Sequence, residues 1–139
     1  MLILLSRKFV YDYQRVTGIS MLNNLKENDI VIIDKTKKIF DRFDIVVLKN
    51  EEDELVVKRI IGLPGESIGC EDGKVYINEN ILKETYVSSK TSTFSIQKIP
   101  KDKYFVMGDN RSNSIDSRVY GPVKTEKIVG KVIKVIKKY

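Results

Sequence analysis

Ser20 and Lys58 are two residues of this sequence that could work together as a nucleophile and its base. Lys58 lies between apolar runs at residues 55–57 and 60–61, and partial desolvation there would lower the pKa of its amine. A neutral amine can accept a proton as a general base, and with Ser20 it would form a serine-lysine dyad. The alternative for Lys58 is the common behaviour of a strand lysine, which extends its amine into water.

The absence of histidine narrows the chemistry further. The 139 residues contain no histidine, which excludes a Ser-His-Asp triad, a Cys-His dyad and a His-ligated zinc site. The single cysteine, Cys70, can form neither an internal disulfide nor a cysteine-rich metal site. We therefore expect Cys70 to be a small buried side chain, and we expect no metal and no other cofactor.

Residues 108–121 form a polar segment directly after an apolar run. Such a segment is not expected in a hydrophobic core, and its many turn-forming residues predict a solvent-exposed loop. A second interpretation rests on four charged residues that could form charge-assisted pairs and so hold the segment in one geometry. These residues are Asp109, Arg111, Asp116 and Arg118.

Short β-branched runs, separated by charged or glycine-containing breaks, predict a mainly β protein. The predicted buried strands are residues 31–33, 45–48, 55–57, 60–61 and 104–107. Turns are indicated at residues 63–65 and 78–80, and the pair Asp72-Gly73 predicts a hairpin. A length of 139 residues without a repeat or linker predicts one domain over residues 1–139.

The chain carries a formal net charge of +6, which favours anionic surfaces such as nucleic acid or lipid headgroups. Part of the excess lies in residues 123–139, which we expect to form a terminal strand at a sheet edge, with its lysines facing solvent. No aromatic interleaving or nucleic-acid motif accompanies these lysines, so we do not expect nucleic-acid binding. No window approaches the roughly 20 apolar residues of a membrane span.

Four blocks of the sequence together resemble the catalytic domain of bacterial type I signal peptidases in their compact Gram-positive form. The blocks are GISM at residues 18–21, RFDIVV at 42–47, VKRIIGLPG at 57–65 and GDNRSNSIDSR at 108–118. The last block is the most specific of the four. The resemblance implies the coiled antiparallel β-sheets of the type I signal peptidase and LexA-like serine-lysine peptidase fold. It also implies a serine endopeptidase that removes signal peptides from exported preproteins.

The resemblance implies a role for each matching residue. Ser20 would be the nucleophile, Lys58 its base and Ser114 the residue that orients the lysine. The oxyanion would be held by the Ser20 backbone N–H, because Gly18 offers no side-chain donor. Residues expected to support the site are Met21, Arg59, Asp109, Asp116 and Arg118. Candidate walls of the substrate pocket are Val16, Gly18, Met21 and Val57, although Val16, Met21 and Val57 could equally be ordinary core residues.

The chain departs from the family pattern at two places. Met21 is followed by LNNL, where the family has a Pro-Thr-Leu motif, and residues 42–44 read RFD in place of Arg-Gly-Asp. Both changes lie near the nucleophile or its supporting strand, so we expect them to affect the shape of the substrate pocket more than the presence of the serine-lysine dyad. The altered segment Leu22-Asn23-Asn24 also favours an alternative function, a pilus assembly factor that binds pilin precursors with little or no cleavage. A LexA-like self-cleaving repressor is a third interpretation, and the block at residues 108–118 argues against it.

Partners and location follow from the same resemblance. We expect the partners to be a signal peptide or pilin precursor and a membrane surface, at the extracytoplasmic face of the cell membrane. Relatives carry an amino-terminal membrane span, so we expect residues 1–13 to be the remnant or flank of such an anchor. The apolar residues 1–5 fit that interpretation, although they could also be a first strand or helix turn.

Overall fold

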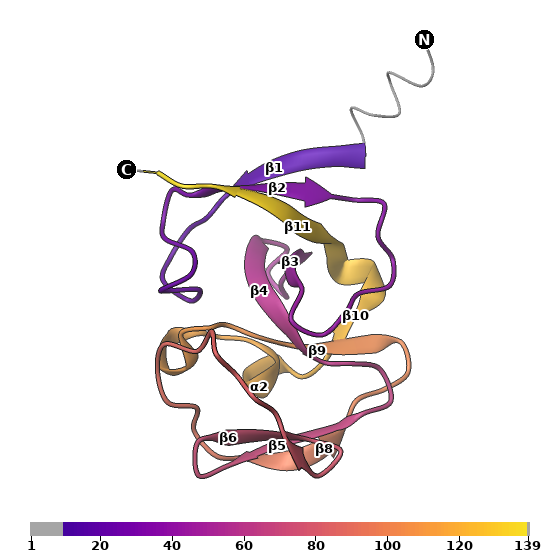
Figure 1. The fold of residues 1–139 in the computed structure, drawn as a ribbon. Helices are drawn as coiled ribbons and strands as arrows, with labels where there is room; N and C mark the ends of the chain where they lie inside the picture. Colours follow the sequence, from indigo (N-terminus) through magenta and orange to yellow (C-terminus); the bar gives the residue numbers. More distant parts are fainter. Residues whose placement is uncertain (1–9, 139) are drawn as a thin grey trace.

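The computed structural model describes residues 10–138, which form two antiparallel β-sheets (Figure 1). The larger sheet has the strand order β1-β2-β11-β3-β4-β9-β10, and the smaller sheet has the order β7-β6-β5-β8. The strands of the larger sheet are β1 (Tyr11–Arg15), β2 (Ile30–Asp34), β3 (Ile45–Lys49), β4 (Leu55–Gly62), β9 (Lys103–Met107), β10 (Val123–Lys124) and β11 (Ile128–Ile136). Those of the smaller sheet are β5 (Ser67–Glu71), β6 (Lys74–Ile77), β7 (Asn80–Ile81) and β8 (Phe94–Lys98). The prediction of a mainly β protein is confirmed.

The hairpin predicted at Asp72 and Gly73 connects β5 to β6. Both residues have positive φ angles, 53° at Asp72 and 77° at Gly73. Two successive left-handed residues match the twist of the flanking strands, which is why an Asp-Gly pair favours a tight hairpin. The next turn, at Asn78 and Glu79, also has positive φ angles and connects β6 to β7.

Strand β4 is longer than the sequence predicts. The apolar runs at residues 55–57 and 60–61 are expected as separate strands, but they form one strand that continues through Lys58 and Arg59. β4 pairs with β3 on one side and with β9 on the other. Charged side chains are accommodated in this interior strand because each has a polar partner, Ser114 for Lys58 and Asp109 for Arg59.

The lysine-rich end of the chain forms strand β11, but β11 is not an edge strand. It lies between β2 and β3 and pairs with both, with a register shift against each (Figure 1). Val129, Val132 and Val135 pack against one of the hydrophobic clusters of the core. Lys134 is exposed, as predicted. A strand that has a neighbour on each side can still present one face to solvent.

The polar segment that follows β9 is only partly the exposed loop that its composition predicts, because several of its charged residues are buried. Asp109 and Asp116 have 0% exposure, and Arg111 has 3%. The segment contains the short helices η1 (Arg111–Asn113) and α2 (Ser117–Tyr120). Burial is possible because the charges are paired, Asp116 with Arg118, Arg111 with Glu84 and Asp109 with Arg59. The second interpretation, in which charge-assisted pairs hold the segment in one geometry, therefore describes it correctly.

The prediction for residues 1–13 falls largely on residues 1–9, which lie outside the described part of the chain. Residues 11–13 belong to β1, which pairs with β2. No helix within residues 10–138 is long and apolar enough to cross a membrane. Cys70 is buried with 3% exposure, as the sequence predicts.

Candidate active site

Lys58 projects from β4 into the interior of the site. Its exposure is 5%, and its Nζ donates a hydrogen bond to the Oγ of Ser114 over 3.2 Å. Burial lowers the pKa of the Lys58 amine, because the ammonium form loses its hydration; the Asp116 carboxylate opposes this shift and the Arg118 guanidinium adds to it. The sequence-based alternative, an amine extended into water, is wrong for this lysine.

Ser114 is held between Lys58 and a buried carboxylate. Its hydroxyl donates to the Oδ2 of Asp116 over 2.7 Å, so its oxygen is left to accept from Lys58. Burial would raise the pKa of Asp116, but hydrogen bonds and charge from Arg118 hold that pKa below its usual range, aided by the backbone N–H of Gly108. Asp116 is therefore ionised and fixes the direction of the Ser114 hydroxyl. A neutral Lys58 held in this way keeps its lone pair free for another proton.

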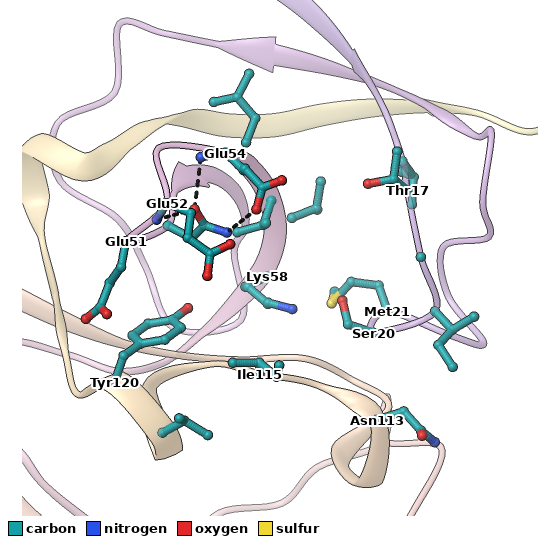
Figure 2. Close-up of a pocket in the computed structure, with 18 of the residues that line it drawn as sticks. Thr17, Ser20, Met21, Glu51, Glu52, Glu54, Lys58, Asn113, Ile115 and Tyr120 are labelled. Carbon is teal, nitrogen blue, oxygen red and sulfur yellow. Dashed lines mark hydrogen bonds between the residues drawn. The ribbon is translucent and has the colours of Figure 1, made fainter.

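Ser20 lies in the loop between β1 and β2, on the other side of the cleft from Lys58. Figure 2 shows the Lys58 amine directed across the cleft toward Ser20 and Met21. The backbone of this loop is fixed by Asn110, whose N–H donates to the Ser20 carbonyl over 2.9 Å and whose side-chain amide donates to the Ile19 carbonyl over 3.1 Å. Among the described residues, no hydrogen bond joins Ser20 Oγ directly to Lys58 Nζ.

A cleft with a volume of about 540 Å³ contains Ser20 and Lys58. Its walls come from residues 15–21, from β4 with the turn before it, and from residues after β9 (Figure 2). All four candidate pocket residues line this cleft, namely Val16, Gly18, Met21 and Val57. Val16, Met21 and Val57 are also buried in one hydrophobic cluster. These three side chains therefore both line the cleft and belong to the hydrophobic core.

Arg59 and Asp109 form a buried ion pair beside the site. Asp109 accepts from Arg59 Nε over 2.8 Å and from Nη2 over 2.7 Å, and the guanidinium lies 4.3 Å from the ring centroid of Tyr86. The backbone N–H of Asp109 also points at the sulfur of Met21, 3.4 Å away. Sequence reasoning identified Arg59 and Asp109 but not Tyr86, which lies in the irregular segment between β7 and β8, where the sequence pattern gives no such signal.

The family model described as signal peptidase, peptidase S26, matches residues 1–136 of this chain. The chain belongs to this family. Signal peptidase I V of Bacillus subtilis is 38% identical over 137 residues, covering 86% of this chain and 81% of the relative. Signal peptidase I S of the same organism is 42% identical over 132 residues, covering 84% and 71%. The crystal structure of a signal peptidase I from Enterococcus faecalis V583 has a TM-score of 0.61 and 35% identity, covering 68% of this chain and 97% of that chain.

These relatives confirm the resemblance seen in the four sequence blocks and the fold class that it implies. This signal peptidase family member is accordingly a type I signal peptidase, a serine peptidase that cleaves signal peptides. The pilus assembly alternative is not favoured, because the matched relatives are named as signal peptidases I. The sequence-based interpretation assigned no role to Asn24 or Asn110. In the structure, the Asn24 amide donates to Asp109 and the Asn110 amide donates to the Ile19 carbonyl, and such long-range contacts cannot be predicted from a single sequence.

The lowered pKa of Lys58 predicts the pH dependence of this signal peptidase. With Lys58 as the base, the neutral amine would be the active form, so kcat/KM should rise with pH as Lys58 loses its proton. Because burial lowers this pKa, the midpoint should fall below the ordinary lysine value of about 10.4. A pH series of initial cleavage rates, with thermal unfolding recorded at each pH, measures this midpoint. A rate that does not change from acid to alkaline pH would remove the lysine from the mechanism.

Proposed function

We propose that Ser20 and Lys58 carry out the cleavage of signal peptides from exported preproteins. The observation that carries this proposal is the buried Lys58 amine, which is held by Ser114 and directed across a cleft toward Ser20 (Figure 2). A lysine in this environment has a lowered pKa, so more of it is neutral and able to act as a base than for an exposed lysine at the same pH. A serine beside such a base has the partner that histidine provides in other serine peptidases.

The reaction would proceed through an acyl-enzyme. Neutral Lys58 removes the proton from Ser20 as the hydroxyl oxygen attacks the scissile carbonyl carbon, and the Ser20 backbone N–H donates to the resulting oxyanion. The Lys58 ammonium then gives its proton to the leaving amine as the peptide bond breaks. Lys58 next takes a proton from water, whose oxygen attacks the ester, and returns it to Ser20 when the signal peptide is released. Gly18 provides no side-chain donor to the oxyanion.

The supporting residues act through the two members of the dyad. Ser114 holds the Lys58 amine, and Asp116 fixes the direction of the Ser114 hydroxyl. Arg118 keeps Asp116 ionised through paired hydrogen bonds of 2.8 and 2.9 Å. In this scheme Ser114, Asp116 and Arg118 contribute orientation and charge rather than covalent chemistry.

The precursor would bind as an extended strand between residues 15–19 and the first residues of β4, which form facing walls of the cleft. Alternate side chains of a strand point the same way, so the residue before the cut and the residue two positions earlier would both face the enzyme. The apolar walls beside the dyad are Val16, Met21 and Val57, which are 4%, 2% and 8% exposed. Their burial leaves little room for movement, so small substrate side chains are favoured.

This pocket predicts a strong preference at the residue before the cut. Changing that residue from alanine to phenylalanine should lower kcat/KM by about 10- to 200-fold, because a closely packed apolar pocket cannot take the ring without strain. The matched control changes the intervening residue, which faces away from the enzyme, and should leave the rate within about twofold. Cleavage of paired precursors followed by mass spectrometry measures both. Equal rates for alanine and phenylalanine would show that the pocket has been assigned wrongly.

The function itself is tested by incubating the protein with a precursor that carries a signal peptide. A product with a new amino terminus after a small residue supports the peptidase. Tight binding without a product would support the pilus assembly factor, with a pilin precursor as its ligand. We also propose that cleavage takes place at the extracytoplasmic membrane surface, since type I signal peptidases are membrane-associated, and fractionation of expressing cells tests this location.

A further inference from the structure

The two members of the dyad come from separate segments of the chain. Ser20 lies in the loop between β1 and β2, whereas Lys58 lies in β4. Within the described residues, β4 pairs with β3 and β9 but has no backbone ladder with β1 or β2. Contacts between loops therefore connect the two segments, and the hydrogen bonds of Asn110 to the Ser20 and Ile19 carbonyls are one set of them.

Asn24 makes such a contact. Its side-chain amide donates to the Oδ2 of Asp109 over 2.8 Å and to the carbonyl oxygen of Tyr86 over 2.9 Å. Asp109 Oδ2 also accepts from Arg59 Nη2, and Arg59 is the neighbour of Lys58 in β4. A short chain of hydrogen bonds thus runs from the loop of Ser20 through Asp109 to the strand of Lys58.

The charge and burial of Asp109 make this contact specific for an amide. Asp109 has 0% exposure, and a hydrogen bond donated to an ionised carboxylate is about twice as strong as a neutral one. The Asn24 nitrogen uses its hydrogens on Asp109 and Tyr86, which fixes the orientation of the amide. An aspartate at position 24 would instead place a second carboxylate against Asp109.

We propose that Asn24 is a positioning residue that sets the geometry between Ser20 and Lys58 through Asp109 and Arg59. This inference rests on the proposed function of Ser20 and Lys58 as a dyad. It gives a role to one residue of the segment LNNL, in which the chain departs from its family pattern. Asn24 supplies a side-chain donor within this segment, so the link between the two segments is present despite the departure.

A thiol in place of the nucleophile tests this geometry without any substrate. In a Ser20→Cys variant that also carries Cys70→Ala, the pKa of the introduced thiol is measured from the pH dependence of its alkylation by iodoacetamide. A Lys58 amine within reach accepts the thiol proton and, as the resulting ammonium, stabilises the thiolate, so this pKa should lie below about 8.5 and Lys58→Met should raise it. Asn24→Asp and the milder Asn24→Ala should raise it in the same direction. Asn23→Ala is the matched control, because both residues are exposed but only Asn24 has side-chain hydrogen bonds within the described part of the chain, so the change at Asn23 should leave the thiol pKa unchanged.

Cleavage kinetics provide the second measurement. In the Ser20 enzyme, Asn24→Asp should lower kcat by about tenfold to 10²-fold with KM changed less than about threefold, since small misplacements of reacting groups act on kcat. Thermal unfolding of each variant shows whether it is folded at the assay temperature. If Asn24→Asp is unfolded there, the kinetics of Asn24→Ala test the proposal instead.

The outcomes separate the inference from the proposed function. A thiol pKa raised by Lys58→Met and by the Asn24 variants, with Asn23→Ala unchanged, supports the positioning role. A pKa raised by Lys58→Met but unchanged in both Asn24 variants would overturn that role and leave the dyad in place. A pKa unchanged by Lys58→Met would overturn the dyad itself, and the role of Asn24 with it.

Discussion

Replacing Lys58 with methionine should lower kcat for precursor cleavage by on the order of 10⁴-fold, because the serine then has no base. Methionine approximates the length of the lysine stem and removes only the amine, whose ammonium form is already disfavoured by burial. The fold should therefore be retained, and the temperature of unfolding should not fall by more than a few degrees. Single-turnover cleavage of a purified precursor and thermal unfolding of the same sample measure the two effects separately.

Two further variants sharpen this expectation. Lys58→Arg should be as inactive as Lys58→Met, since a guanidinium stays protonated at any working pH and cannot accept the serine proton. Ser20→Ala should be equally inactive, and combining it with Lys58→Met should add almost nothing, because nucleophile and base act as one unit. Turnover by Lys58→Arg within about tenfold of the parent protein would show that a different group is the base.

Much of the fold could be predicted because it depends on local patterns. The β-branched runs became β2, β3, β4 and β9, and the pair Asp72-Gly73 forms the hairpin between β5 and β6. These features need only backbone preferences and short-range burial. The order of the strands could not be obtained in this way, because the position of β11 between β2 and β3 depends on contacts far apart in the sequence.

Candidate site residues could be named from the sequence, but the contacts between them could not. Ser20 and Lys58 could be proposed from chemistry alone, since a chain without histidine that uses a serine nucleophile needs another base. The burial of Asp109 and Arg111 was not predictable from the composition of their segment, because it depends on partners outside that segment. Asp109 pairs with Arg59, and Arg111 pairs with Glu84. A polar segment can become interior when distant residues neutralise its charges.

Gly108 shows how closely the parts of the site approach one another. A Cβ at this position would lie 2.2 Å from Ser114 Oγ, 2.6 Å from Ser114 Cβ and 2.6 Å from the Ser20 carbonyl oxygen. The backbone N–H of Gly108 donates to Asp116 over 2.9 Å, so the glycine backbone cannot move away without losing that bond. Only glycine at position 108 leaves enough space for Ser114 and the loop of Ser20 to lie this close together.

Gly108→Ala should therefore lower kcat by on the order of 10³-fold, because the methyl group must displace Ser114, which holds the proposed base, and the Ser20 backbone, which carries the proposed oxyanion donor. Crowding should also destabilise the fold by about 1–3 kcal/mol. Gly130→Ala is the matched control, since its Cβ would lie 2.4 Å from the Asp34 carbonyl oxygen in β2, in another part of the larger sheet. That control should lose stability but keep kcat per folded molecule. If Gly108→Ala also kept its kcat at a temperature where it is folded, the close approach of Ser114 and Ser20 would not be needed for catalysis.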